Sequence, residues 1–319
     1  MLRLTALLLA LISSAALAQD AFPSKPIRLI VPFVPGGNVD ITARTVAPAL
    51  GEALGQPIVI ENRTGAAGMV GAQALLAAPA DGHTLMMGSN SSLAVAPNLY
   101  PNWPYDPRTG IAPISNLAVT PFVLVVKLAL PVQTVADVIR LAKEKPGQLA
   151  MASGGNGSSN QLVGELFQMM TGVKFSHVPY KGTGAALVDL SGGQVDLLFD
   201  QASSTVPNVR GGKIRAIAVA SSSRQSALPD TPTFAEAGIK DFRVDNFTGL
   251  VGPAGMPADA VAKVHAAAVK ALATPAVKER FASLGVQPVG NTPGEWGAEI
   301  RADLARWAKV IKAAGIKAE

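Results

Sequence analysis

The sequence predicts an α/β fold, and two patterns in the chain carry that prediction. Short apolar segments typical of strands alternate with Ala-rich segments that have helical periodicity. Few of the strand segments alternate apolar with polar residues, which indicates strands that are buried on both faces. We therefore expect largely parallel sheets that are covered by helices on both sides.

The expected elements follow in chain order. Strands are predicted at 27–33, 57–61, 84–87, 122–127, 149–152, 195–199 and 214–220. Helices are predicted at 41–54, 69–78, 135–144, 161–171 and 184–191. Two later helices, at 258–273 and 293–314, have apolar stripes that need burial, so we interpret them as packing elements and not as partner-binding helices.

The N-terminus is typical of a secretory signal peptide covering residues 1–18. Arg3 precedes an apolar run at 4–12, and small residues at 16–18 form a cleavage pattern. An uncleaved anchor is the alternative, but the run is short and is interrupted by serines. No cysteine follows that could carry a lipid, so we expect a mature protein that begins near Gln19 and is free in the periplasm.

Composition excludes several classes of protein. The chain has 319 residues and no cysteine, which rules out disulfides and thiolate metal sites. The net charge is +5, and the basic residues are scattered without aromatic neighbours, which argues against nucleic-acid binding. The longest later apolar stretch, 122–130, contains Lys127, so we expect no membrane-embedded segment after the leader.

A glycine elbow follows the first predicted strand. Phe33 ends that strand, and Pro35, Gly36 and Gly37 lead into the helix expected from residue 41. Two glycines permit a tight turn with exposed N–H groups, and the positive end of a helix dipole attracts anions. The elbow therefore predicts an anion-binding lip.

Similar loops follow other predicted strands. They lie at 88–92, 153–160 and 179–184, and an acidic strand end lies at 199–201. In open α/β sheets, ligands bind at the carboxyl ends of strands, so these loops could converge into a polar cage for an anion. The competing interpretation is that they are ordinary turns with Ser and Asn helix caps.

Two aspartates in these loops, Asp40 and Asp200, are interpreted differently. Asp40 falls in the first turn of its predicted helix, so we rank stabilisation of the helix start first and ligand contact second. For Asp200 we rank ligand contact first.

No catalytic constellation is evident in the sequence. The loop at 153–160 lacks the Gly-Lys-Ser/Thr ending of a phosphate loop and the closing glycine of a Gly-x-Ser-x-Gly elbow. His83, His177 and His265 are isolated, with no metal-binding spacing, and each is interpreted as a surface or turn residue. We expect no enzyme activity, no metal and no cofactor.

A set of motifs in fixed order resembles the Bug family, the extracytoplasmic solute receptors of tripartite tricarboxylate transporters. The resemblance covers essentially the whole mature chain. The segments that carry it are 26–33 with 35–37 and Asp40, 59–63 with 65–68, 156–159, 178–182, 192–196, 214–219, 228–238 and 249–255.

The resemblance implies a type II periplasmic binding protein fold, with two doubly wound α/β domains joined by two crossover strands. The crossovers would lie near 117–122 and 245–250. Domain 1 would then comprise 19–120 plus 246–319, and domain 2 would comprise 121–245.

The resemblance also implies a ligand and a site. The ligand would be a small carboxylate (a mono- or dicarboxylate, aromatic acid or amino acid) held by backbone amides, hydroxyls and waters and delivered to a two-subunit membrane permease by a monomeric receptor. The alternative is a ligand-dependent sensing adaptor for a membrane sensor kinase. The implied ligand-binding residues are Phe33, Pro35, Gly36, Gly37, Asp40, Ser89, Ser91, Ser92, Ser153, Asn156, Gly157, Ser158, Ser159, Gly182, Thr183, Gly184 and Asp200.

The chain departs from the usual family pattern in three places. Leu93 stands where a polar residue is frequent, Gly154 and Gln161 replace a hydroxyl and a titratable ring, and Ala185 stands where proline is usual. These changes alter the hydrogen-bonding groups of the loops, so the ligand of any one relative does not transfer to this chain.

Overall fold

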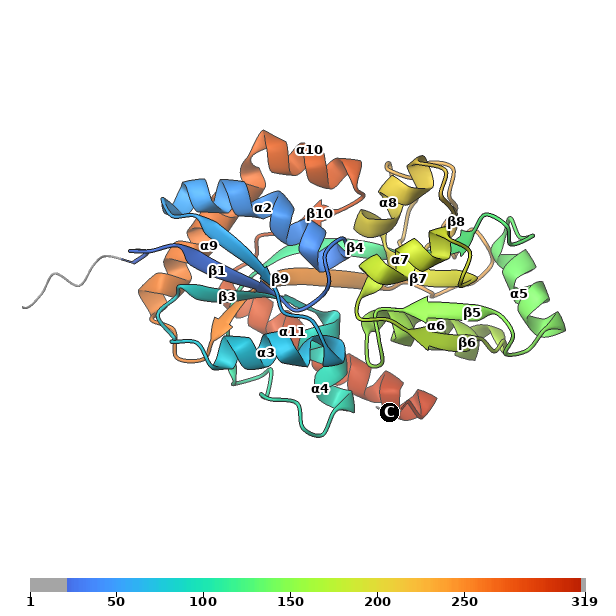
Figure 1. Cartoon of the computed structure of the whole chain (residues 1–319), viewed down its shortest axis with the longest axis horizontal. Coiled ribbons are helices and arrows are strands. Elements are labelled where there is room, and N and C mark those ends of the chain that lie inside the picture. The colour runs from blue at the N-terminus through green and yellow to red at the C-terminus, as the bar shows by residue number, and fades with distance from the viewer. Residues whose placement is uncertain (1–21, 317–319) are drawn as a thin grey trace, which may run out of the picture.

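A computed structural model describes residues 22–316, and the signal peptide expected at 1–18 lies outside the described residues. The chain forms two lobes side by side (Figure 1). The first lobe is built on β1 (Ile27–Val31), β2 (Ile58–Asn62) and β3 (Thr84–Ser89). The second is built on β5 (Ala150–Ser153), β6 (Ser176–Pro179), β7 (Leu197–Gln201) and β8 (Ile214–Val219).

Two strands run between the lobes. β4 (Ile111–Lys127) is 17 residues long and pairs antiparallel with β9 (Asp245–Pro253), from Ile111↔Pro253 to Pro121↔Asp245. The strand order is β2-β1-β3-β9-β4-β7-β5-β6, with β8 and β10 (Gln287–Pro288) also paired to β4. β4 therefore belongs to both lobes, and the predicted crossovers coincide with the β4–β9 pair.

Helices connect the strands. They are α2 (Asn38–Leu54), α3 (Met69–Leu76), α4 (Ala96–Leu99), α5 (Val135–Glu144), α6 (Ser159–Thr171), α7 (Thr183–Ser191), α8 (Ala202–Arg210), α9 (Ala258–Ala273), α10 (Pro275–Ser283) and α11 (Pro293–Ala314). Two short turns, η1 (Ala66–Gly68) and η2 (Ser91–Val95), lie in the first lobe.

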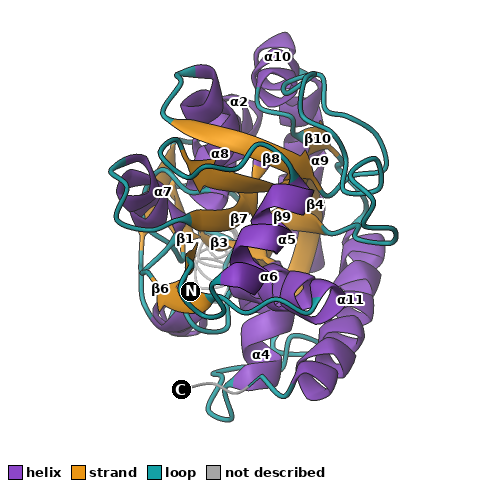
Figure 2. Cartoon of the chain, turned by 90° about the vertical axis from the view of Figure 1, so that its right-hand side faces the viewer, coloured by secondary structure: helices purple, strands orange, loops and turns teal. Residues whose placement is uncertain are grey.

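Both faces of the sheet are covered, as the sequence predicts. In the first lobe, α2, α9 and α10 pack on one face through a core that includes Leu29, Leu85 and Phe281. In the second, α7 and α8 cover one face, while α5 and α6 cover the other. This last core continues into the first lobe beneath α11, and Figure 2 shows helices on both sides of the strands. The α/β prediction is confirmed, but the expectation of largely parallel sheets is wrong. β4 pairs antiparallel with β7, β8, β9 and β10, and β9 pairs antiparallel with β3, because the strands that run between the lobes pair against their neighbours in the opposite direction.

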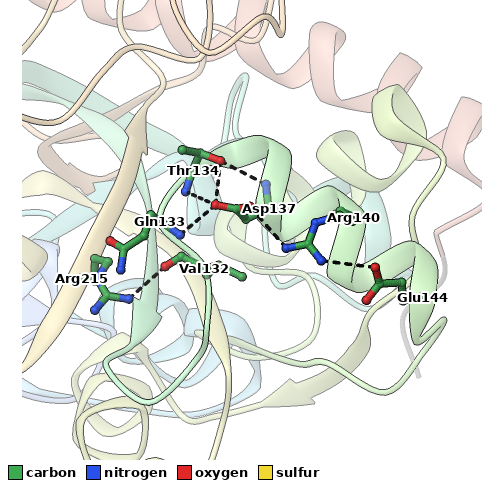
Figure 3. A network of polar contacts seen from close by, with 7 residues as sticks. All are labelled: Val132, Gln133, Thr134, Asp137, Arg140, Glu144 and Arg215. Carbon is green, nitrogen blue, oxygen red and sulfur yellow. Dashed lines mark hydrogen bonds and ion pairs between the residues drawn. The ribbon is translucent and has the colours of Figure 1, made fainter.

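The start of α5 shows how the second lobe fixes a helix end (Figure 3). Thr134 and Asp137 form a reciprocal capping box, and Arg140 lies between Asp137 and Glu144. From β8, Arg215 donates to the carbonyl oxygen of Val132 at 2.9 Å. Such capping satisfies N–H groups that have no partner inside the helix.

The predicted helices at 258–273 and 293–314 are confirmed, and both are packing elements that bury their apolar stripes. The predictions missed β6, β10, α4, α8 and α10, and they gave only the second part of β4, at 122–127. The sequence of α8 has no clear apolar stripe and includes Pro207, which the helix accommodates near its C-terminal end.

Within residues 22–316, no single helix is long and apolar enough to cross a membrane. Only taken together do α9 and α10 have the length and apolar composition of a membrane span, and the two helices are bent by 68° relative to each other.

Candidate functional site

The glycine elbow between β1 and α2 is fixed by hydrogen bonds to the side chain of Asp40. Its carboxylate accepts from the Gly36 N–H at 3.1 Å, from Arg44 Nε at 2.9 Å and from Asn62 Nδ2 at 3.0 Å. Burial by itself would raise the pKa of Asp40, but these hydrogen bonds and the Arg44 charge lower it below 3.8. Asp40 thus positions the elbow, and Gly37 precedes α2 without any side-chain cap.

Ser89 ends β3 with its hydroxyl group unused. The residue is 2% exposed, and its Oγ has no hydrogen-bond partner among the described residues. The neighbouring Ser92 Oγ accepts from the Ser89 N–H at 3.1 Å, which fixes the turn. A buried hydroxyl without a partner is costly in a folded protein, so its presence at a strand tip points to a ligand.

The third loop leads into α6 through two glycines with left-handed backbone, Gly155 (φ 119°) and Gly157 (φ 74°). Ser158 caps the helix by accepting from the Gln161 N–H. Ser153 Oγ lies 2.6 Å from His177 Nε2, so this histidine supports the loop, a role that the sequence did not predict.

The loops converge on a cavity between the lobes, which we call the inner cavity. Its volume is about 30 Å³. It is lined by Phe33, Gly37, Asn38, Val39, Ser89, Ser91, Gly154, Ser158, Asn160, Gly182, Thr183, Gln201 and Asn246. None of these lining side chains is ionisable. The N-terminal ends of α2, α6, α7 and α8 all contribute, so four positive helix ends meet at one small space.

The sequence-predicted residues occupy three kinds of position. Phe33, Gly37, Ser89, Ser91, Ser158, Gly182 and Thr183 line the inner cavity. Asn156 lines a larger neighbouring cavity. Pro35, Gly36, Asp40, Ser92, Ser153, Gly157, Ser159, Gly184 and Asp200 line neither cavity, although they lie in the loops around them.

Several lining residues were not singled out from the sequence. Three of them lie inside the predicted loops, each directly after a residue that the sequence analysis named: Asn38, Asn160 and Gln201. Asn246 belongs to β9 and lies 209 residues after Gly37 of the elbow, so nothing local in the sequence indicated it.

The lobes touch through their cavity loops. Ser91 Oγ of the first lobe accepts from the Ser159 N–H of the second at 3.0 Å. Ser203 Oγ donates to Asn38 Oδ1 at 2.6 Å, and Tyr100 donates to the carbonyl oxygen of Asn156 at 2.8 Å. The conformation is therefore a closed one.

Asp200 lies behind the inner cavity wall. It is fully buried and accepts from Asn160 Nδ2 at 3.0 Å and from Ser204 Oγ at 2.6 Å. Burial raises the pKa of Asp200 to about 6, and the surrounding hydrogen bonds offset only part of that rise. Asp200 orients Asn160, which lines the cavity.

We expect Asp200→Asn to change how stability depends on pH. A carboxyl group whose pKa is raised on folding stabilises the protein least when ionised, so its contribution is lost as pH rises through about 6. Between pH 5 and 7.5 the wild type should lose roughly 1 kcal/mol more unfolding free energy than the variant. Urea unfolding at both pH values measures this, and equal pH dependence in the two proteins would contradict it.

We also expect Ser89→Ala to weaken ligand binding about tenfold or more without lowering stability. A hydrogen bond to a charged group contributes about 1.5–3 kcal/mol, whereas the hydroxyl has no partner within the protein to lose. Thr42→Val is the matched control, because Thr42 Oγ1 is also buried without a partner but does not line the cavity. Calorimetric titration measures the affinities; equal effects of the two substitutions would refute this assignment.

Two lobes joined by two strands, with a cavity lined by helix N-terminal ends between them, define the class of two-lobed solute-binding proteins. The family model described as "Tripartite tricarboxylate transporter family receptor" matches residues 42–316. The chain belongs to this family, whose members are periplasmic solute-binding receptors and not enzymes. The resemblance to the Bug family is confirmed.

Individual relatives agree with this assignment. Protein BugT of Bordetella pertussis is 37% identical over 305 residues, which cover 95% of this chain and 94% of BugT. The periplasmic binding protein BugD has a TM-score of 0.90 at 32% identity, covering 93% of this chain and 100% of BugD.

Two ligand-bound structures are also similar. R. palustris Rpa4515 with adipate has a TM-score of 0.90 at 35% identity, covering 93% of this chain and 99% of that one. MatC from Rhodopseudomonas palustris with bound malate has a TM-score of 0.87 at 34% identity, with coverage of 91% and 100%.

Proposed function

We propose that this receptor captures a small carboxylate in the inner cavity by closure of its two lobes, and delivers it to a two-subunit membrane permease. The observation that carries the proposal is the meeting of four helix N-terminal ends at a cavity without ionisable lining side chains. Helix N-terminal amides and dipoles favour a negative group, and neutral hydroxyl and amide donors can complete its hydrogen bonds.

The size of the inner cavity supports the same ligand chemistry. About 30 Å³ is room for one or two water molecules or for a single small polar group. A carboxylate at this position would accept from the unused Ser89 hydroxyl. Relatives that hold adipate and malate are consistent with an acid ligand.

Closure requires the lobes to move as units. We propose domain 1 as 19–120 plus 246–319 and domain 2 as 121–245, joined where the antiparallel pair of β4 and β9 passes between the lobes. We further propose that the leader at 1–18 directs the chain to the periplasm and is removed after Ala18, and that the receptor acts as a monomer.

Calorimetric titration of the mature chain tests the proposed function. A form of the protein that starts at Gln19 is unfolded and refolded to remove any acid that co-purifies. It is then titrated with mono- and dicarboxylates, aromatic acids and amino acids, with neutral sugars as controls. We expect saturable binding of at least one acid and of no sugar. Binding of sugars with no response to any acid would refute the proposal.

A further inference from the structure

The third cavity loop, at 153–160, is held by side chains that lie outside the inner cavity. Ser153 is the last residue of β5, and Gln161 lies in the first turn of α6. His177, on the neighbouring strand β6, contacts both: its Nε2 is 2.6 Å from Ser153 Oγ, and its Nδ1 is 3.4 Å from Gln161 Nε2. We call these three side chains the loop brace. The brace ties both ends of the loop to a separate strand of the same lobe.

The donors and acceptors of the loop brace fit one protonation state of the His177 ring. Gln161 Oε1 accepts from the Gly157 N–H at 2.8 Å, so the Gln161 amide turns its NH2 group, which can only donate, toward Nδ1. Nδ1 is therefore the nitrogen without a proton, and Nε2 donates its proton to Ser153 Oγ. The Ser153 hydroxyl in turn donates to the Gly155 carbonyl oxygen at 3.2 Å. The ring is thus neutral.

A second proton on the ring would break this arrangement. An imidazolium donates from both nitrogens, so its Nδ1–H would face the NH2 group of Gln161. Turning the Gln161 amide over would restore that contact but would place its NH2 group against the Gly157 N–H. A hydrogen bond of the loop is lost in both orientations. Histidine ordinarily gains its proton between pH 5 and 8, and His177 is only half-buried, so the change lies within an accessible pH range.

The loop that the brace holds carries part of the site and of the contact between the lobes. Gly154 and Ser158 line the inner cavity. The Asn156 carbonyl oxygen accepts from the Tyr100 hydroxyl of the first lobe at 2.8 Å. Gly157 has φ 74°, a region that glycine enters at little cost, so the loop backbone is free to move once its hydrogen bonds are lost. Such movement would reduce the population of the closed conformation and lower the apparent affinity in proportion.

Other titratable groups near the brace have to be distinguished from the ring. β5 and β6 contain no aspartate, glutamate, lysine or arginine, and Lys174 and Lys181, on either side of β6, are exposed. α6 contains one charged residue, Glu165, one turn beyond Gln161, and burial raises the pKa of its carboxyl group. Asp200 acts on the same cavity through another contact, and burial raises its pKa to about 6. Variants of Glu165 and Asp200 are therefore needed as controls.

We propose that His177 and Gln161 are positioning residues that hold the third loop in its ligand-binding geometry while the ring is neutral and release it when the ring gains a proton. The receptor then binds its acid at neutral pH and releases it at acidic pH. Gln161 stands where the family frequently has a titratable ring, so the pairing of an amide with His177 does not follow from family membership. The effect on affinity rests on the proposed function, whereas the protonation state of the ring is measurable without a ligand.

Nitrogen NMR of the refolded, ligand-free chain with 15N-labelled histidine tests the protonation state. At pH 7.5 we expect His177 to have a protonated Nε2 and an unprotonated Nδ1; the absence of its signals in His177→Gln assigns them. Gln161→Glu should raise the midpoint of the ring's titration by about one pH unit, because a carboxylate accepts from Nδ1–H and from the Gly157 N–H together. A proton on Nδ1 in the wild type, or an unchanged midpoint in Gln161→Glu, would overturn the inference.

Calorimetric titration at pH 7.5 and pH 5 tests the effect on affinity. The probes are malate, adipate and the acid that binds most tightly in the carboxylate screen. His177→Gln keeps a donor for Ser153 but has no ring to protonate, so it should match the wild type within about threefold at pH 7.5 and bind at least about tenfold more tightly than the wild type at pH 5. Protonation of the probe affects both proteins equally, so the ratio of their affinities isolates the ring.

Two controls and the possible outcomes separate the proposals. Glu165→Gln should keep the wild-type loss of affinity at pH 5, and the difference between His177 and His177→Gln should persist when both carry Asp200→Asn. If the wild type binds acids with the same pH dependence as His177→Gln, the inference is wrong and the carboxylate receptor stands. If no acid binds to the refolded wild type at pH 7.5, the proposed function fails and the effect on affinity fails with it.

Discussion

Replacing Gly184 with alanine is expected to weaken carboxylate binding by about a hundredfold while the protein stays folded. Gly184 is the second residue of α7 in the second lobe. A methyl group at this position would lie well inside van der Waals contact of the Pro35 carbonyl oxygen, which belongs to the elbow of the first lobe. The obstacle is backbone, so no side-chain rotation relieves it. The closed state would become a minor population, and the apparent affinity falls in proportion.

The free energy of unfolding should not decrease in Gly184→Ala. The clash exists only between the lobes, and alanine is favoured over glycine in a helix by up to about 1 kcal/mol. Gly192→Ala at the other end of α7 is the matched control, because its added methyl would have no neighbour closer than 3.4 Å. Calorimetry and urea unfolding of both variants measure the effects. Wild-type affinity in Gly184→Ala would show that closure does not bring these loops together.

Trp296→Ala is expected to have the largest effect on stability, a loss of about 3–5 kcal/mol of unfolding free energy. Trp296 is fully buried near the start of α11. Its indole N–H donates to the Leu250 carbonyl oxygen at 3.1 Å, and its ring meets Phe247 edge-on with centroids 4.8 Å apart. Both partners belong to β9, so the side chain fastens α11 to a strand that runs between the lobes.

Trp296→Phe separates packing from hydrogen bonding at this position. Phenylalanine keeps most of the apolar contact but leaves the Leu250 carbonyl oxygen without its indole donor, so a smaller loss of about 1–3 kcal/mol is expected. Equilibrium urea unfolding followed by circular dichroism measures both variants. A loss below about 1 kcal/mol in Trp296→Ala would contradict the packing role.

Elements with strong local signals could be predicted from the sequence. The helices at 258–273 and 293–314 have clear apolar stripes, and their predicted bounds match the structure. Elements without such signals were missed. β6 is a four-residue edge strand with no buried residue. α10 is a short helix with a low mean hydropathy. Tertiary packing, not local pattern, specifies these segments.

The candidate site could be predicted at the level of loops but not of individual atoms. Glycine-rich strand ends indicated where N–H groups gather, and these loops do converge on the inner cavity. The positions of Asp40 and Asp200 depend on contacts with Asn62 and Asn160, which only the folded chain brings near. Asn246 reaches the cavity through β9, so its part in the lining required the long-range pairing of β4 and β9.

A crystal structure of the mature chain with a bound acid from the calorimetric screen tests the central claim most directly. The account predicts one carboxylate in the inner cavity, within hydrogen-bond distance of Ser89 Oγ and of the N-terminal amides of α2 and α7. A carboxylate bound outside this cavity, with an uncharged part of the ligand occupying it, would contradict the claim that four helix ends and neutral donors form an anion site.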